Sequence, residues 1–240
     1  MTRPGENPPA RPKRFYETVQ CVEDQGAFAI TLDGRSAKTR TGQPLAMQSR
    51  ALALAVADEW DAQREIIDIA AMPMTRLAMT VVDIGDADAD SWRAAILSFL
   101  KSDLLCYRAS EPAELVQRQA LCWDPLLKWV KAELGAELAT GAGVAFVDQP
   151  PASIEAAARH LAVQTPARLL GVKNAAEIAG SAVIALALLE GAFPAATLFE
   201  ASRVDEAFQA ERWGLDAEAQ ARARRLERDF ADAARFLSLV

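Results

Sequence analysis

The side chains that could carry catalysis are few and lie far apart in this sequence. His160 is the single histidine, within AAARHLAV, and the cysteines are Cys21, Cys106 and Cys122. Covalent catalysis by a serine or a cysteine needs a nucleophile, a base and a group that orients the base, and no motif places such residues together. We therefore expect no catalytic residue and a structural role for His160. A hydrolase-like enzyme that uses His160 or a cysteine is the alternative.

Residues that could hold a metal ion or a nucleotide do not form a recognisable motif either. Asp86, Asp88 and Asp90 resemble the start of a calcium-binding EF-hand loop. That loop requires glycine at its sixth position and glutamate at its twelfth, where this sequence has Ser91 and Leu97. The cysteines and the histidine lack zinc-site spacing, and no glycine-rich phosphate loop occurs. We expect no metal and no cofactor, and a solvated acidic loop around these aspartates.

The net charge of −7 argues against several classes of partner. A duplex-binding protein needs a basic face to neutralise phosphates, and an anionic membrane surface repels an acidic protein. Three cysteines without CxxC spacing indicate a reducing compartment. No secretory leader and no transmembrane run is recognisable. The sequence predicts a cytoplasmic protein that binds no nucleic acid and does not insert into a membrane.

The N-terminal part of the chain combines β and α patterns. Residues 1–14 contain four prolines and four basic residues, and are predicted to form a disordered tail. The alternating segment FAITL at 28–32 predicts a strand, and Asp33-Gly34 predicts a hairpin turn directly after it. Residues 15–108 are predicted to form an α/β domain, in which helices cover one face of a small antiparallel sheet. The expected helices begin near Ser49, Pro73 and Ser91.

The C-terminal part, residues 109–240, has an almost entirely helical pattern. Its most apolar stretch, IAGSAVIALALL at 178–189, is uncharged and too short to cross a bilayer, so it is predicted to be a central helix wrapped by protein. Asp124-Pro125 should interrupt one helix, Gly171 should end another, and 194–213 should form a third. The predicted fold class is α+β, a small antiparallel β-sheet with covering helices at the N-terminus followed by a mostly α-helical C-terminal domain.

Several aromatic and basic residues lie outside the obvious core pattern. The tryptophans among them are Trp60, Trp123, Trp129 and Trp213. Because tryptophan is commonly well buried, these side chains are expected to fix loops and the domain junction. The alternative is a protein-binding surface, in which tryptophan and arginine are enriched. Arg14 and Arg35 leave a similar choice between a functional patch and solvation of the sheet edge.

Seven short motifs occur between Arg14 and the C-terminus. In chain order they are RFY at Arg14–Tyr16, LDGR at Leu32–Arg35, EWDAQ at Glu59–Gln63, MPMTRLAMTVVD at Met72–Asp83, SDLLCYRA at Ser102–Ala109, Q…WDPLL at Gln119–Leu127 and FQAERWG at Phe208–Gly214. Together and in this order, they resemble the ATP synthase assembly chaperone of mitochondria and alphaproteobacteria, the family that holds the alpha subunit of the catalytic (F-one) sector. Because no clear transit peptide precedes the motifs, the chain resembles a bacterial, cytoplasmic member.

The resemblance implies an assembly chaperone and not an enzyme. It implies a protein, expected to be a monomer when free, that binds the free alpha subunit and prevents its aggregation until the beta subunit pairs with it. The family's functional carboxylate is carried over to Glu206 or Glu211. With Asp205, these residues are expected to form an acidic helical surface for basic residues of the alpha subunit, and Trp213 and Trp60 join the partner-binding set. A generic helical scaffold for another protein is a third possibility.

Overall fold

The computed structural model describes residues 12–143 and 145–240. The chain divides into two compact units, Met1–Ile84 with Leu239–Val240, and Gly85–Ser238. The predicted division into a tail and two domains with a boundary at residue 108 stays a prediction, because compactness alone does not define a folding domain. Within the two described ranges, no helix has both the length and the apolar character needed to cross a membrane.

The first unit contains the predicted antiparallel sheet. Strand β2 is central, because it pairs with β1, β3 and β4. The strands are β1 (Val19–Asp24), β2 (Ala27–Leu32), β3 (Arg35–Ser36) and β4 (Ala46–Met47). Asp33 and Gly34 turn the chain between β2 and β3 with φ of 49° and 74°, the left-handed backbone that the Asp-Gly pair predicted.

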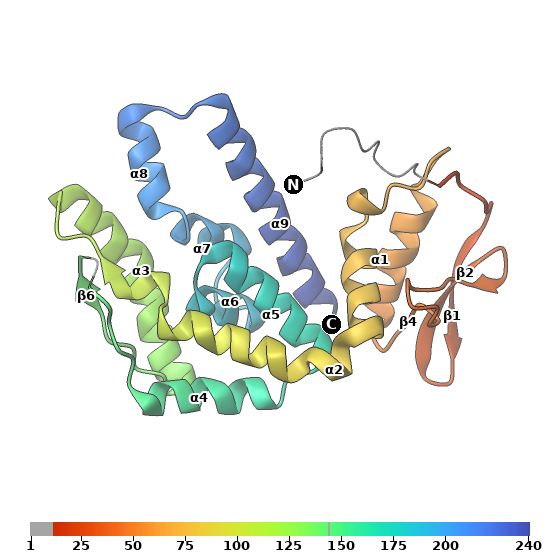
Figure 1. Cartoon of the computed structure of the whole chain (residues 1–240), viewed down its shortest axis with the longest axis horizontal. Helices are drawn as coiled ribbons and strands as arrows, with labels where there is room; N and C mark the ends of the chain where they lie inside the picture. The colour runs from red at the N-terminus through yellow and green to blue at the C-terminus, as the bar shows by residue number, and fades with distance from the viewer. Residues whose placement is uncertain (1–11, 144) are drawn as a thin grey trace. The chain divides into compact units, whose positions relative to one another are not determined.

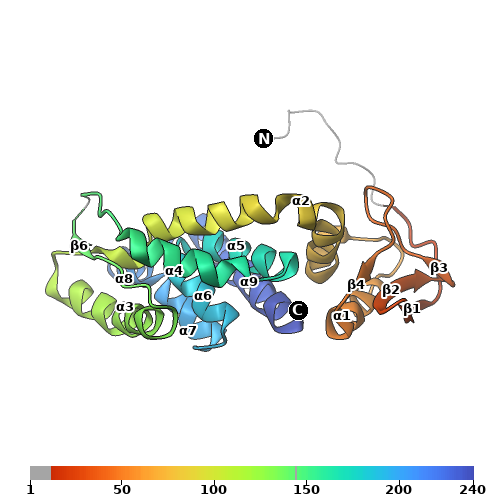
Figure 2. The same ribbon diagram turned by 90° about the horizontal axis from the view of Figure 1, so that it is seen from below.

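Helix α1 (Arg50–Asp61) covers the sheet by packing against β1, β2 and β4 (Figure 2). Ser49 begins the helix as predicted, since its hydroxyl oxygen accepts a hydrogen bond from the amide of Leu52. Near the other end, the carboxylate of Glu59 accepts hydrogen bonds from the amides of Met74 (2.8 Å) and Thr75 (2.7 Å). Glu59 therefore satisfies two free amides at the start of the next helix, which links the EWDAQ and MPMT segments physically.

The segment predicted as a tail reaches this unit at its end. Residues 1–11 lie outside the described residues. The amide of Arg14 donates to the carbonyl of Glu65 (2.9 Å), and the amide of Ile67 donates to the carbonyl of Pro12 (2.8 Å). Residues 12–14 thus run antiparallel to residues 65–67, next to the 3₁₀ turn Ile69–Ala71.

Helix α2 runs without interruption from Pro73 to Lys101, so the predicted acidic loop around Asp86, Asp88 and Asp90 and the predicted helix start near Ser91 are wrong. Asp86, Asp88 and Asp90 lie inside the helix, where Asp90 pairs with Arg93 three residues later. The alternating alanines of this segment favour helix, and aspartate on a solvent-facing side costs only a fraction of a kcal/mol, roughly 0.7 at most. The absence of the EF-hand glycine removes the turn that would have broken the helix.

The second unit is built around the predicted apolar stretch, although two helices share it. Helix α5 (Pro166–Ala179) continues through Gly171 and ends at Gly180, which has a left-handed φ of 68°. Ser181 then caps α6 (Ala182–Leu189), whose residues from Ala182 to Ala187 have no exposed surface. Figure 1 shows α6 among α3, α5 and α7, the helices that it contacts. The core position of the stretch is confirmed; the single helix and the end at Gly171 are wrong.

Two further predicted helix boundaries are also corrected. Helix α3 (Ala113–Leu134) contains Pro125 in its interior, where the exposed position lets water replace the lost backbone hydrogen bond. The segment 194–213 forms two helices, because the chain turns at Ser202-Arg203. The other elements of this unit are η2 (Leu104–Cys106), β5 (Tyr107–Arg108), β6 (Gly141–Ala142), α4 (Pro151–Ala162), α7 (Ala195–Ala201), α8 (Val204–Trp213) and α9 (Ala217–Leu239).

Candidate functional site

The predicted partner-binding residues fall into two places. Asp205, Glu206, Glu211 and Trp213 all lie on α8, which packs against α3 in the second unit. Trp60 lies in the first unit at the end of α1 and is 6% exposed. Its ring packs edge-on against Tyr16, and its carbonyl accepts a hydrogen bond of 2.7 Å from the Tyr16 hydroxyl. The structure therefore brings the α8 residues together and leaves Trp60 in the core of the other unit.

Asp205 is held by a buried amide on α3. Its carboxylate accepts a hydrogen bond of 2.7 Å from Nε2 of Gln119, which is 1% exposed. The Oε1 atom of Gln119 accepts in turn from the amide of Ala109 at 2.8 Å. Both ends of this side-chain amide are thus satisfied, and Asp205 anchors the first turn of α8 to α3. Asp205 has a structural role, whether or not a partner also contacts it.

Glu211 forms a two-pronged ion pair with Arg118 of α3. Both guanidinium Nη atoms lie 2.7 Å from the Glu211 carboxylate oxygens. The hydrogen bond from Arg118 lowers the pKa of Glu211, and the same contact raises the pKa of Arg118. Glu114 joins the cluster, because it pairs with both Arg118 (3.3 Å) and Arg212 (3.1 Å). Two arginines and two glutamates leave this cluster with no net charge.

Phe208 lies beneath this charge cluster and is 4% exposed. The guanidinium carbons of Arg212 and Arg118 lie 4.3 Å and 5.3 Å from the centre of its ring. Cation–π contacts of this kind are worth about 0.5–1 kcal/mol each at exposed sites. The ring therefore fixes the two arginines in place, and the arginines in turn hold the glutamates.

Glu206 has its partner in Arg203, the residue directly before α8. Its carboxylate lies 3.1 Å from Nη1 of Arg203, whose Nη2 atom donates a hydrogen bond of 3.0 Å to the carbonyl of Ile178. All three predicted acids thus have a partner within the chain, but arginines offset the charges of Glu206 and Glu211 only, since the partner of Asp205 is a neutral amide. Binding of a partner through these residues stays a prediction.

Large apolar side chains stand free beside the paired charges. Trp213 is 76% exposed at the end of α8, and Leu215 is 46% exposed just after it. On α3, Leu121 is 78% exposed. We call the set formed by Glu114, Arg118, Leu121, Glu206, Glu211, Arg212, Trp213 and Leu215 the α3–α8 surface. Sequence reasoning missed Arg118, because its pairing with Glu211 of α8 joins distant segments of the chain.

The residues considered for an enzyme do not assemble into a catalytic group. Nε2 of His160 lies 3.0 Å from Oε1 of Glu190, and no described contact joins His160 to a cysteine. Burial raises the pKa of Cys106 to about 12 and also raises the pKa of the exposed Cys122 thiol. Both thiols stay protonated at neutral pH and are poor nucleophiles. The described residues contain no group of three metal-binding side chains.

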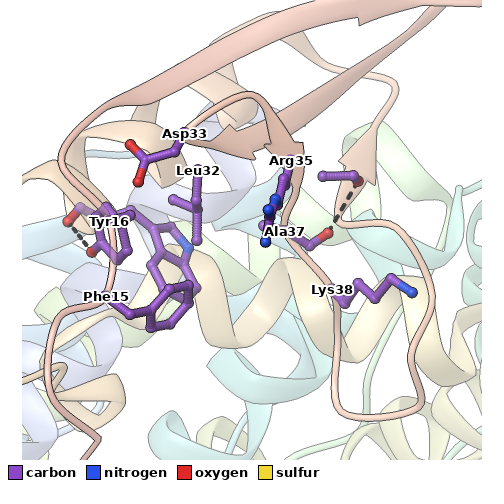
Figure 3. A pocket seen from close by; sticks show the side chains of 9 residues that line it. Phe15, Tyr16, Leu32, Asp33, Arg35, Ala37 and Lys38 are labelled. Atoms are coloured by element: carbon purple, nitrogen blue, oxygen red, sulfur yellow. Dashed lines mark hydrogen bonds between the residues drawn. The ribbon is translucent and has the colours of Figure 1, made fainter.

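A pocket of about 610 Å³ lies in the first unit. Three of the sequence motifs, RFY, LDGR and EWDAQ, contribute to its walls together with residues 36–38. Figure 3 shows Phe15 and Tyr16 on one side of the pocket, Arg35, Ala37 and Lys38 on the other, and Leu32 and Asp33 between them. Motifs that are far apart in the sequence therefore converge on one concave surface.

Arg14, which precedes the pocket residues, has a structural role. Its guanidinium donates hydrogen bonds to the carbonyls of Tyr16, Glu17, Asp61 and Gln63, and its carbon lies 4.6 Å from the centre of the Tyr16 ring. These contacts fasten the segment before β1 to the segment after α1. Arg35, in contrast, is exposed, and the choice between a functional patch and solvation of the sheet edge stays open for it.

Comparison with known proteins gives concordant results. Residues 13–131 match the model of a family described as ATP12 chaperone protein. The solved structure of Atp12 from Paracoccus denitrificans is 38% identical, with a TM-score of 0.91 over 95% of this chain and 97% of that chain. An aspartate-to-lysine variant of the Paracoccus protein gives the same values.

A third solved structure comes from Agrobacterium tumefaciens and was determined as that of a candidate chaperone. It is 40% identical, with a TM-score of 0.90 over 95% of this chain and 86% of that chain. Identity at this level over nearly the whole length accompanies a common fold, and the family model accounts for the N-terminal half. The chain therefore belongs to the ATP12 chaperone family.

Proposed function

We propose that this chain is an assembly chaperone in the bacterial cytoplasm that binds the free alpha subunit of the ATP synthase catalytic sector. It keeps that subunit from aggregating until the beta subunit takes its place. Membership of the ATP12 family supports the chaperone role, and the motif resemblance supports the alpha subunit as client. No step of this function requires turnover of a substrate.

The observation that carries the proposal is the exposure of Trp213. Its side chain is 76% exposed, although burying an aromatic side chain is worth several kcal/mol, about 2–3 on an area basis. Tryptophan is strongly enriched among the residues that dominate binding energy at protein interfaces. Leu215 and Leu121 add apolar area on the α3–α8 surface. We assign the contact with the client to this surface.

The paired charges of this surface give specificity more than affinity. Because Glu206 and Glu211 already have arginine partners, a client must either align with these pairs or replace one member of each. Aligned polar groups at the edge of an apolar contact fix its register and disfavour wrong partners. Asp205 stabilises this surface, because its hydrogen bond with Gln119 holds α8 against α3.

The test is capture of purified alpha and beta subunits, offered separately to the immobilised chain in buffer without nucleotide. The proposal predicts retention of alpha, no retention of beta, and release of alpha when beta is added. Equal retention of alpha and of unrelated unfolded proteins would instead support a generic scaffold. Retention of neither subunit would contradict the proposed client.

Two variants locate the surface. Trp213→Ser should weaken capture of alpha by at least about tenfold, the loss of one interface hot spot. Val163→Ser is the matched control, because Val163 is 80% exposed directly after α4 and outside the α3–α8 surface. Equal capture by the two variants would remove Trp213 from the interface.

The Arg118→Glu, Glu211→Arg double variant tests whether the client needs an acid at position 211 or only an ion pair between positions 118 and 211. It keeps an ion pair between α3 and α8 while it exchanges the two charges. If the client recognises an acid at position 211, the folded variant should lose capture. Its melting temperature should also fall somewhat, because the new acid at position 118 lies one turn from Glu114 and the contact with the Phe208 ring is lost. Unchanged capture would show that only the pair matters, and the carboxylate role carried over to Glu211 would be wrong.

A further inference from the structure

The pocket of the first unit combines an apolar floor with unused positive charge. Leu32, Ala37 and Trp60 are each no more than 6% exposed, while Phe15 stands at the rim with 70% of its surface exposed. Arg35 and Lys38 also line the pocket and are exposed. Within residues 12–143 and 145–240, neither side chain forms an ion pair or a hydrogen bond that the structure records.

The one acid in the pocket wall is already engaged. The Asp33 carboxylate accepts hydrogen bonds from the amides of Glu17 (3.0 Å) and Thr18 (2.8 Å) and from the Thr18 hydroxyl. Its oxygens are therefore directed to the backbone before β1. Arg35, Lys38 and Asp33 together leave the pocket walls with one net positive charge in a chain whose net charge is −7.

A second observation at the pocket is an unpaired polar atom. The indole Nε1 atom of Trp60 is buried and has no hydrogen-bond partner. A buried donor without a partner costs about 1–3 kcal/mol. Because Trp60 lines the pocket, the signal of this indole N–H reports on a ligand that binds there. The wall itself is fixed, because the Tyr16 hydroxyl is bonded to the Trp60 carbonyl and Arg14 lies over the Tyr16 ring.

We propose that this pocket binds an acidic segment of a partner protein, with a bulky apolar side chain against Phe15 and Leu32 and a carboxylate at Arg35 and Lys38. Exposed aromatic and arginine side chains, here on opposite sides of one pocket, are enriched at protein contacts. The chain's own residues 1–11 fit less well, because they carry Arg3 and Arg11 against a single Glu6. This inference rests on the proposed function only in taking the client as the source of the segment.

The direct test uses the full chain and three synthetic peptides. They are acetyl-Gly-Glu-Phe-Glu-Gly-amide and the same peptide with glutamine or lysine in place of both glutamates. The readout is the amide and indole NMR spectrum, in which the Trp60 Nε1–H signal is assigned with the Trp60→Phe variant. The glutamate peptide should shift the Trp60 signal and bind at least about tenfold tighter than the lysine peptide. Equal shifts with all three peptides, or none up to 5 mM or so, would overturn the proposal.

Variants test the residues that make the contact. Arg35→Glu with Lys38→Glu should abolish the preference for the glutamate peptide. The control is Arg222→Glu with Arg224→Glu, which changes the net charge equally at exposed positions on α9. Phe15→Ser should weaken binding of all three peptides, while Val163→Ser should not. Loss of preference in the control pair would reduce the effect to overall charge and contradict the proposed contact.

Two further outcomes distinguish this proposal from binding of the chain's own residues 1–11 and from the proposed function. If deletion of residues 1–11 shifts the Trp60 signal and the glutamate peptide does not, the pocket belongs to the chain's own terminus and the proposal fails. If the glutamate peptide binds as expected but the alpha subunit is not captured, the pocket stands and the proposed client falls. The peptide experiment and the capture experiment can therefore fail independently.

Discussion

A buried carboxylate shows how one residue can couple this fold to pH. Asp103, in the SDLLCYRA motif, is completely buried in the second unit. Its oxygens accept hydrogen bonds from the amides of Leu105 (3.1 Å) and Val183 (3.0 Å), so that it caps both η2 and the N-terminus of α6. Burial raises the pKa of Asp103 from 3.8 to about 6, although these hydrogen bonds oppose the rise.

This raised pKa predicts a pH dependence with a definite sign. Between about pH 4 and pH 6 the folded chain holds the Asp103 proton and the unfolded chain releases it, so stability falls as the pH rises through this range. We expect the free energy of unfolding of the unmodified chain, relative to Asp103→Asn, to be larger at pH 4.5 than at pH 7 by roughly 2 kcal/mol. Urea unfolding of both proteins at the two pH values measures this difference.

The Asp103→Asn variant is itself the control for this prediction. Asparagine does not titrate, and it offers one acceptor where the carboxylate offers two, so Asp103→Asn should be less stable at both pH values. A difference between the proteins that does not change with pH, or that grows as the pH rises, would contradict a raised pKa for Asp103.

At the level of single residues, the sequence predicted helix caps and turns better than it predicted which side chains pair with one another. The cap at Ser49 and the turn at Asp33-Gly34 depend on the residues themselves, and the structure confirms both. The pairing of Glu211 with Arg118 joins residues 93 positions apart, and no local pattern contains it. The sequence of α8 alone also omits the positive charge that Arg118 of α3 places beside Glu211.

The contact between α5 and α9 restricts position 171 to glycine. Gly171 lies inside α5, where glycine costs about 1 kcal/mol relative to alanine. A Cβ atom there would lie 2.5 Å from Cδ2 and 2.7 Å from Cγ of Leu237 on α9, closer than van der Waals contact allows. The helix tolerates the glycine because α9 packs against its bare backbone.

Gly171→Ala should therefore destabilise the chain, although the same change in an open helix would stabilise it. Overpacking of this kind costs about 1–3 kcal/mol, which outweighs the gain in helix propensity. Chemical unfolding of Gly171→Ala, Leu237→Ala and the double variant measures the coupling. If the clash is the cause, Gly171→Ala should be neutral or favourable in the Leu237→Ala background, and equal losses in both backgrounds would disprove it.

At the level of elements, the sequence predicted which segments are helical better than where they end. The predicted breaks at Asp86–Asp90 and Pro125 failed, because an exposed helix side tolerates aspartate and even a proline when water can serve the freed carbonyl. The prediction that Gly171 ends a helix failed because its cause is packing against α9. Gly180, which lies inside the predicted central helix, is where α5 ends, since its backbone is left-handed and Ser181 directly after it caps α6.

For the whole molecule, the distribution of charge determines which kind of contact each proposed binding surface offers to a client. The net charge of −7 led to the expectation of an acidic contact surface. On the α3–α8 surface, however, Glu114 and Glu211 are matched by Arg118 and Arg212. The exposed cations without a recorded partner at the pocket, Arg35 and Lys38, lie in the other unit. Apolar contact should thus dominate binding at the α3–α8 surface, and charge should dominate binding at the pocket.

This division predicts how salt affects capture of the client. The Arg35→Glu, Lys38→Glu variant removes the charge-dependent site, so its affinity for the alpha subunit should change by less than about threefold between 0.1 and 0.5 M NaCl. The unmodified chain should lose affinity more steeply over the same range, because exposed charge pairs are screened within about 10 Å at 0.1 M salt. Titration calorimetry should also show a negative heat-capacity change for the variant, the mark of apolar burial. A loss above about tenfold for the variant would mean that the α8 acids release their arginines and bind the client by charge after all.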